Sequence, residues 1–276
     1  MRLSLNVTNY SWTGGIHDEL SRVVQRADEA GIDTVWVSDH LIQADPTSVP
    51  DSEMLEAYTT LGFLAARTAR VRLGTMVSAV TYRPAALLVK AVTTLDVLSG
   101  GRAWLGIGAG YHEEEARAMD LPLPAVPERF ERLEETVRLA LRMWSDDSSP
   151  GSSPAPVHKP HPPILIGGTG ERRTLLLVAR YADACNLFDI PDRGATVKRK
   201  LAVLADHCAT LGRPYDDIEK TISTRLSPDE PTGAFVERCH TLASFGVTHA
   251  VVLTSGPWTD EALKRLAAAV PAVEGI

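Results

Sequence analysis

The feature that most constrains the fold is an alternation of two patterns along the whole chain. A short run of apolar or β-branched residues is followed each time by a longer segment with apolar residues at helical spacing. Such alternation is typical of parallel strands covered by helices. Eight strands are expected, at residues 3–7, 34–37, 71–77, 103–107, 164–166, 182–188, 218–224 and 248–253.

Eight strand and helix pairs in 276 residues match the size of a (β/α)8 barrel, the TIM-barrel fold. An open, doubly wound sheet is the alternative fold with the same alternation. No change in composition divides the chain, so we expect one barrel domain over residues 1–276. The expected helices include residues 54–69, residues 128–144 and a segment opened by Pro84 and ended by Gly100.

Residues 163–180, PILIGGTGERRTLLLVAR, combine an apolar strand, a glycine-rich turn and the start of a helix. Gly167, Gly168 and Gly170 permit positive φ angles and let a ligand approach backbone N–H groups closely. The free N–H groups at the start of the helix favour an anion, and Arg172 adds positive charge. The segment therefore predicts a site for one phosphate group. A tight connection between strand and helix is the alternative.

In a barrel of this kind the functional groups stand where the strands end. Asp39 and His40 directly follow the second expected strand. A carboxylate beside an imidazole can accept a proton or bind a substrate oxygen, so this pair is the candidate catalytic site. The alternative interpretation is a helix cap or a salt bridge within the loop.

The motif GIGAG at residues 106–110 follows a predicted strand, as the glycines of dinucleotide-binding folds do. Tyr111 and His112 come next, and three consecutive glutamates then stand where a pyrophosphate would rest. Because carboxylates repel a pyrophosphate, a dinucleotide site is not expected. These glycines instead indicate close approach of the backbone to a flat ligand, or tight barrel geometry.

The chain is acidic, with a formal net charge of -7. Nucleic acids and anionic membrane surfaces select for basic patches, so neither is expected as a partner. No stretch is long and apolar enough to span a membrane, and the first residues do not resemble a signal peptide.

Three cysteines, Cys185, Cys208 and Cys239, lie far apart and lack CxxC spacing. Neither a disulfide framework nor a zinc site is expected, and reduced thiols are typical of a cytoplasmic protein. His158 and His161 form an HxxH pair in a proline-rich loop without cysteine or carboxylate neighbours. We interpret them as linker residues and expect no metal.

Several longer motifs occur together in one order. They are VWVSDHL (35–41), EAYTTLGFLAARTARVRLGT (56–75), TYRPAALLVKAVTTLDVLSGGRAWLGIGAG (81–110), ERFERLEE (128–135) and PPILIGGTGERRTL (162–175). In this order they resemble the bacterial luciferase-like monooxygenase superfamily. Within it the chain is most similar to the actinobacterial branch of oxidoreductases that use the deazaflavin coenzyme F420. The resemblance covers nearly the whole chain and implies a luciferase-like (β/α)8 barrel.

The resemblance also implies a site at the mouth of the barrel. His40 and Asp39 would be catalytic, beside the reactive face of the deazaflavin ring. The cofactor-binding residues would be Asp39, Met76, Val77, Ala109, Gly110, Tyr111, Gly167, Gly168, Thr169, Gly170 and Arg172. In relatives, the segment that corresponds to Met76 and Val77 presses against the ring and carries a non-proline cis peptide. The phosphate of the coenzyme would rest on the glycine turn after the fifth strand.

The activity implied by the resemblance is hydride transfer between F420 and a small organic substrate, with His40 or Asp39 handling the proton. An FMNH2- and oxygen-dependent monooxygenase is the alternative within the superfamily, and a non-catalytic flavin-binding protein is a second alternative. Relatives are commonly homodimers, and the apolar surface of residues 54–64 is a candidate interface.

The chain departs from its relatives in two places. Relatives that oxidise sugar phosphates carry a glutamate where Tyr111 stands, so that activity is not implied. The segment before the fifth strand is also shorter, because residues 145–161 contain only SDDSSPGSSPAPVHKPH. A Ser/Pro linker of this kind forms little of a lid. We therefore expect an open substrate pocket, or one completed by a partner subunit.

Overall fold

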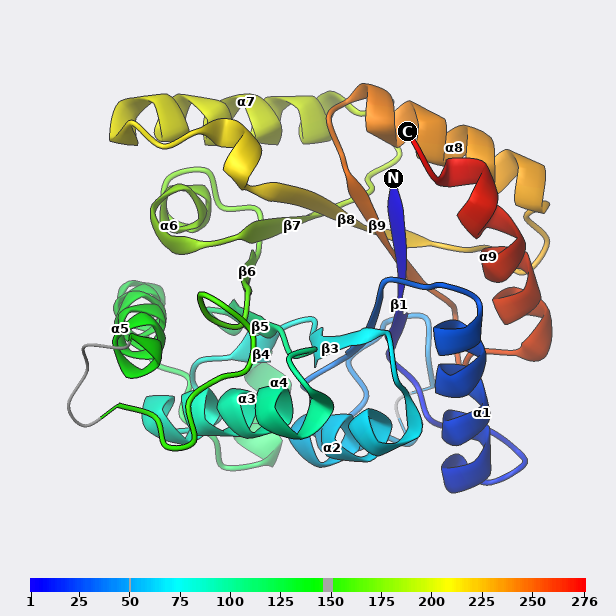
Figure 1. Ribbon diagram of the computed structural model, residues 1–276, viewed down its shortest axis with the longest axis horizontal. Coiled ribbons are helices and arrows are strands. Elements are labelled where there is room, and N and C mark those ends of the chain that lie inside the picture. Colours follow the sequence, from blue (N-terminus) through cyan, green and yellow to red (C-terminus); the bar gives the residue numbers. More distant parts are fainter. Residues whose placement is uncertain (50, 146–150) are drawn as a thin grey trace.

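The computed structural model describes residues 1–49, 51–145 and 151–276. Its strands form one parallel sheet that curves round into a barrel (Figure 1). The strands are β1 (Arg2–Val7), β2 (Thr34–Val37), β3 (Arg72–Thr75), β4 (Ser78–Ala79), β5 (Leu105–Gly108), β6 (Ile164–Gly167), β7 (Ala184–Phe188), β8 (Glu219–Arg225) and β9 (His249–Leu253). Their order in the sheet is β3-β2-β1-β9-β8-β7-β6-β5-β4. Each strand pairs in parallel with its neighbours, as strands joined by helical crossovers must.

Helices cover the outer face of the barrel (Figure 1). They are α1 (Ile16–Glu29), α2 (Ala57–Arg67), α3 (Ala85–Ser99), α4 (Glu113–Ala118), α5 (Val126–Trp144), α6 (Thr174–Tyr181), α7 (Ala195–Leu211), α8 (Thr232–Ser244) and α9 (Asp260–Val273), with a short 3₁₀ turn, η1 (Tyr215–Asp217), before β8. Among the described residues, no helix combines the length and the apolar composition needed to cross a membrane.

β3 and β4 are two parts of one barrel strand, divided at the Met76–Val77 peptide, which is cis. β3 pairs with β2, and β4 pairs with β5. The barrel closes where Leu73 exchanges backbone hydrogen bonds of 2.8 Å with Arg102 and Trp104. The predicted (β/α)8 barrel is therefore confirmed, and the doubly wound open sheet is excluded.

Helix boundaries follow capping residues more closely than apolar periodicity. α3 follows Pro84 and ends at Gly100, whose φ of 72° is in the left-handed region, as the sequence predicts. α2 begins later than the expected residue 54, because the Glu56 side chain caps it by accepting the N–H groups of Tyr58 and Thr59. α4 was not predicted. Three glutamates in its first turn favour it, because they lie beside the positive end of the helix dipole.

The barrel interior is filled at the end where the strands begin. Trp36 and Trp104 pack there with ring centroids 5.6 Å apart, in a buried cluster with Leu165 and Val251. A Cβ at Gly74 would lie 2.7 Å from the Trp36 ring, so glycine makes room for the indole. Because this end is packed, the space inside the barrel lies at the opposite end, where the strands finish.

Candidate functional site

A cavity of about 830 Å³ lies at the end of the barrel where the strands finish. Most of the predicted site residues line it: Asp39, His40, Met76, Val77, Ala109, Gly110, Tyr111, Gly167 and Gly168. Thr169, Gly170 and Arg172 belong to the turn between β6 and α6 and are not among the lining residues. The fold thus brings together residues at or just after the ends of four strands, β2, β3, β5 and β6, as TIM barrels do.

His40, directly after β2, is held by a buried carboxylate of α4. Its Nδ1 lies 2.7 Å from Oε2 of Glu115, whose side chain is fully buried. Tyr82 donates its phenol O–H to the same Oε2, and the N–H of Leu41 donates to Oε1. Since Nδ1 is engaged with Glu115, Nε2 is the ring nitrogen that remains for a ligand.

The protonation of this cluster follows from its hydrogen bonds. Burial by itself would raise the pKa of Glu115, but the hydrogen bonds from His40, Tyr82 and Leu41 outweigh burial and lower the pKa to about 2. An ionised carboxylate only accepts hydrogen bonds, so Nδ1 of His40 carries a proton. Burial and the Glu115 carboxylate raise the pKa of Tyr82, so its phenol stays a donor.

Asp39 is paired with an arginine inside the protein. Arg83 donates to its two carboxylate oxygens at 2.6 and 2.9 Å, and the Asp39 side chain has no exposed surface. Arg83 also donates to Glu56 at 2.6 Å and lies over the Tyr58 ring. Burial works against the charge on Arg83, but its hydrogen bonds to Asp39 raise the pKa of the guanidinium. Asp39 is therefore in a salt bridge with a residue that follows another strand, and not in the salt bridge within its own loop that was the alternative interpretation.

Glycines let Val77 sit at the floor of the cavity. A Cβ on Gly108 or on Gly167 would lie 2.9 Å from the methyl groups of Val77. A Cβ on Gly106 would lie only 1.8 Å from the carbonyl oxygen of Thr75. The GIGAG motif thus permits close contact between neighbouring strands, which is the tight barrel geometry that the sequence indicated.

The turn between β6 and α6 forms an open backbone cradle. Gly168 has a φ of 114°, which a residue with a side chain rarely adopts. At Gly170 a Cβ would lie 2.9 Å from Oγ1 of Thr174, the first residue of α6. Arg172 and Arg173 are exposed beside this turn, and Arg173 lies over the Phe130 ring at 5.6 Å. The helix start, the glycines and the arginines together suit an anionic group.

Residues 6–269 match the sequence model of the luciferase-like monooxygenase family. The chain belongs to this family. Curated relatives include proteins named "F420-dependent glucose-6-phosphate dehydrogenase". The one from Kineococcus radiotolerans is 32% identical over 247 residues, which are 83% of this chain and 70% of the relative. The one from Microbacterium testaceum is 30% identical over 75% of this chain and 63% of the relative.

Solved structures agree on the luciferase-like fold. An F420-dependent secondary alcohol dehydrogenase in complex with an F420-acetone adduct superposes with a TM-score of 0.84, at 16% identity over 99% of both chains. An F420-dependent tetrahydromethanopterin reductase from Methanopyrus kandleri superposes with a TM-score of 0.75, at 14% identity over 98% of both chains. At these identities the likeness concerns the fold alone.

Four polar residues of this luciferase-like protein complete the cluster, but sequence reasoning gave them no role: Glu115, Tyr82, Arg83 and Arg129. Arg129 donates to the carbonyl oxygen of Gly110 at 2.5 Å, and its Nε is buried without a partner among the described residues. Tyr82, Arg83 and Arg129 lie inside the family motifs at residues 81–110 and 128–135, and these motifs were the only sign in the sequence that they matter. The sequence could not assign their roles, because their hydrogen-bond partners lie on other loops.

The short segment before β6 runs away from the cavity mouth. The N–H groups of Val157 and His158 donate to Asp96 Oδ2 at 2.7 and 2.9 Å, near the end of α3. His161 stacks on Trp144 with ring centroids 5.9 Å apart. The described part of this segment therefore forms no wall over the site. Residues 146–150, which also belong to the segment, lie outside the described residues.

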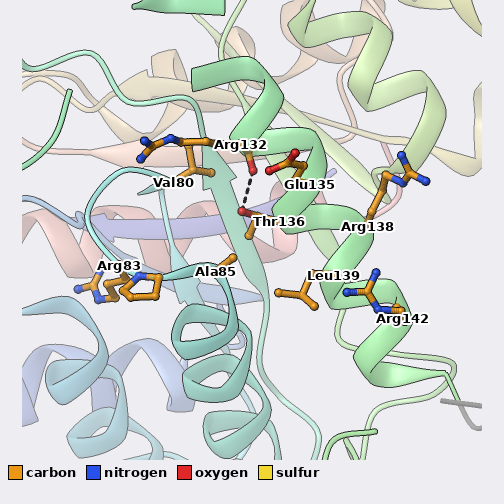
Figure 2. A pocket seen from close by; sticks show the side chains of 10 residues that line it. Val80, Arg83, Ala85, Arg132, Glu135, Thr136, Arg138, Leu139 and Arg142 are labelled. Carbon is orange, nitrogen blue, oxygen red and sulfur yellow. Dashed lines mark hydrogen bonds between the residues drawn. The ribbon is translucent and has the colours of Figure 1, made fainter. Parts of the chain in front are cut away.

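A second hollow, of about 530 Å³, lies on the outer side between α3 and α5. Figure 2 shows Arg138, Leu139 and Arg142 projecting from α5 at this place, with Thr136 Oγ1 bonded to the carbonyl oxygen of Arg132 at 2.7 Å. None of the predicted site residues lines it. Within the described parts of the chain, no cluster of His, Cys, Asp and Glu is placed to hold a metal ion.

Proposed function

We propose that this luciferase-like protein transfers a hydride between coenzyme F420 and a small organic substrate in the cavity at the barrel mouth. The observation that carries the proposal is the pairing of His40 with buried Glu115 at the edge of a cavity whose floor is glycines and Val77. A ring that donates or accepts a hydride needs a flat surface below it and one proton-handling group beside it. The names of the curated relatives support F420 as the coenzyme.

The residues present fit the coenzyme. Gly168 and Gly170 leave space where a Cβ would be strained or crowded, and the α6 start with Arg172 offers positive charge to a phosphate. Thr169 and Gly167 complete this turn. The buried Nε of Arg129, for which the described residues offer no partner, adds a donor on the same side of the cavity.

The flat ring of F420 would lie against Met76 and Val77, with Ala109, Gly110 and Tyr111 along its side chain. These five residues all line the cavity. When bound, F420 would supply a carbon centre that donates or accepts a hydride, which is a proton together with two electrons.

The chain's own residues handle the proton. In reduction of a carbonyl group, Nε2 of His40 gives its proton to the oxygen as the hydride reaches the carbon, so that C=O becomes CH–OH. In oxidation of an alcohol, Nε2 takes the hydroxyl proton. Charged Glu115 stabilises the imidazolium and holds the ring in place. Both carboxylate oxygens of Asp39 accept hydrogen bonds from Arg83, so we assign Asp39 a positioning role and assign the proton transfer to His40.

The experiment that tests this function is a fluorescence titration of the protein with F420 and, separately, with FMN. Gly168→Asp should abolish F420 binding, because a carboxylate would stand in the phosphate cradle. Gly212→Asp is the matched control, since Gly212 also has a positive φ, has no atom within 4 Å of an added Cβ and lies at the end of α7. Binding of FMN alone would favour an oxygen-dependent monooxygenase. If neither coenzyme bound, a non-catalytic role would replace the proposal.

The homodimer and the cytoplasmic location also belong to the proposal. Leu87 and Leu98 of α3 are 58% and 73% exposed; they lie outside the predicted interface of residues 54–64, but α3 packs beside α2, which contains most of that segment. Covering such leucines with a second copy removes apolar surface from water. Leu98→Glu should convert a dimer into monomers in light scattering. The three free, buried cysteines suit the reducing cytoplasm.

A further inference from the structure

We infer that the substrate side of the cavity accepts an uncharged molecule and excludes phosphorylated and carboxylated ones. The inference rests on the proposed function and names the substrate class of that same site. It concerns the part of the cavity formed by the ends of β1, β7 and β8 and by the loop after β2. The lining residues that matter there are Asn6, Thr8, Asp45, Phe188, Asp189 and Arg225.

The charges that line the cavity do not favour an anion. The charged lining residues are Asp39, Asp45, Asp189, Arg129 and Arg225, to which His40 adds an imidazole. No lysine is among the lining residues. The residues outside the described ranges, 50 and 146–150, contain no Lys, Arg or His that could add a cation. Phosphate and carboxylate ligands are normally held by arginine or lysine with free donors. Arg129 and Arg225 are therefore the two side chains to consider.

Arg225, at the end of β8, is already paired. It bonds both carboxylate oxygens of Asp45 at 3.3 Å and the carbonyl oxygen of Thr254 at 2.7 Å. Burial would raise the pKa of Asp45, but hydrogen bonds from Thr47 and the charge of Arg225 lower it. Asp45 therefore stays ionised and cancels the charge of Arg225. The other arginine, Arg129, lies on the cofactor side and donates to Gly110.

Asp189, after β7, adds negative charge on the substrate side. It accepts a hydrogen bond of 2.6 Å from Thr224 and lies 3.3 Å from Nη1 of Arg238. Arg238 also forms an ion pair with Glu230, whose Oε2 lies 2.7 Å from Nη2 of the guanidinium. Two carboxylates thus face one guanidinium at this place. An incoming phosphate would meet a surplus of negative charge.

Uncharged groups are available instead. Oδ1 of Asn6 and Oγ1 of Thr8 are buried and have no hydrogen-bond partner among the described residues, although both residues line the cavity. A buried polar atom without a partner is costly, so a ligand that pairs with it is favoured. Phe188, which is 52% exposed, offers an apolar wall at the same mouth. A hydroxyl or carbonyl group on an otherwise apolar molecule suits these three side chains.

The test is calorimetric titration of the F420-loaded protein with glucose 6-phosphate. The wild-type protein should show no heat of binding up to the highest concentration used, whereas Asp45→Asn, which releases Arg225, should bind at low salt with a Kd at least about ten-fold below that concentration. Glu128→Gln is the control. It makes the same charge change and releases Arg132 of α5, which pairs with Glu128 at 2.7 Å; neither residue lines the cavity, so the variant should leave binding unchanged.

Two results would overturn the inference: binding or oxidation of glucose 6-phosphate by the wild-type protein, or no gain in binding by the folded Asp45→Asn protein. Circular dichroism and thermal unfolding establish that the variant is folded, and Asp189→Asn provides a second variant that removes one carboxylate from the same side. Failure of the proposed function is seen separately, as absence of F420 binding. The phosphate titration can then be carried out on the coenzyme-free protein and interpreted in the same way.

Discussion

Nδ1 of His40 lies 2.7 Å from the buried carboxylate of Glu115, a residue 75 positions further along the chain. The ionised carboxylate fixes both the orientation of the imidazole and the proton on Nδ1, so Nε2 is the nitrogen to which we assign the proton transfer in the proposed function. The residue that the sequence predicts to be catalytic is thus positioned by one to which the sequence assigned no role.

Glu115→Gln should reduce kcat by roughly ten-fold or more, because an amide neither fixes the tautomer of His40 nor stabilises the imidazolium. F420 affinity should change little. Steady-state kinetics and an F420 titration on the same protein measure the two quantities. Equal loss of F420 affinity and of kcat would instead indicate a merely structural role for Glu115.

The same variant gives a prediction on stability and pH. The pKa of Glu115 is about 2 in the folded protein and 4.5 when unperturbed, so its ionisation stabilises the fold above pH 4.5. This contribution, on the order of 3 kcal/mol, is lost as pH falls from 4.5 towards 2. Thermal unfolding of the wild type and Glu115→Gln should differ most near neutral pH and converge in acid. A constant difference across this range would contradict the ionised pair.

His40→Asn should lower turnover by about 10²- to 10⁴-fold, because asparagine cannot exchange a proton at this position. F420 binding should persist, since the phosphate cradle is untouched. Turnover measured across pH is the decisive quantity. If the variant keeps wild-type turnover at every pH, His40 does not handle the proton.

Arg83→Met should destabilise the fold by about 3 to 5 kcal/mol, because it leaves the carboxylate of Asp39 buried and unpaired. The double variant Arg83→Met with Asp39→Asn should recover much of this loss, since no buried charge then remains. Urea unfolding of the wild type, the single variant and the double variant measures the coupling. An additive double variant would show that the two side chains do not interact in solution.

Gly106→Ala should cost about 3 kcal/mol or prevent folding, because the added Cβ would overlap the carbonyl oxygen of Thr75 on the neighbouring strand. Gly233→Ala is the matched control in α8. No atom lies within 4 Å of a Cβ there, so the change should stabilise the helix by about 0.5 to 1 kcal/mol. Melting temperatures of the two variants should move in opposite directions.

The alternation of short apolar runs with segments of helical spacing was enough to predict the barrel. All eight expected strand segments overlap observed strands, and residues 34–37 match β2 at both ends. The segment 71–77 differs, because it is interrupted at Met76 and Val77 and continues as β4. α4 was missed, since six residues give too little periodicity to be recognised.

The glycine turn, the strand-end pair Asp39 and His40 and the family motifs were visible in the sequence by themselves, because each depends on residues close together in the chain. Only the tertiary structure decided the partners: Glu115 for His40, Arg83 for Asp39 and Asp45 for Arg225. These pairs join loops that follow different strands. Their hydrogen bonds and shared burial exist only once the barrel has closed, and they determine which side chains keep a free charge at the site.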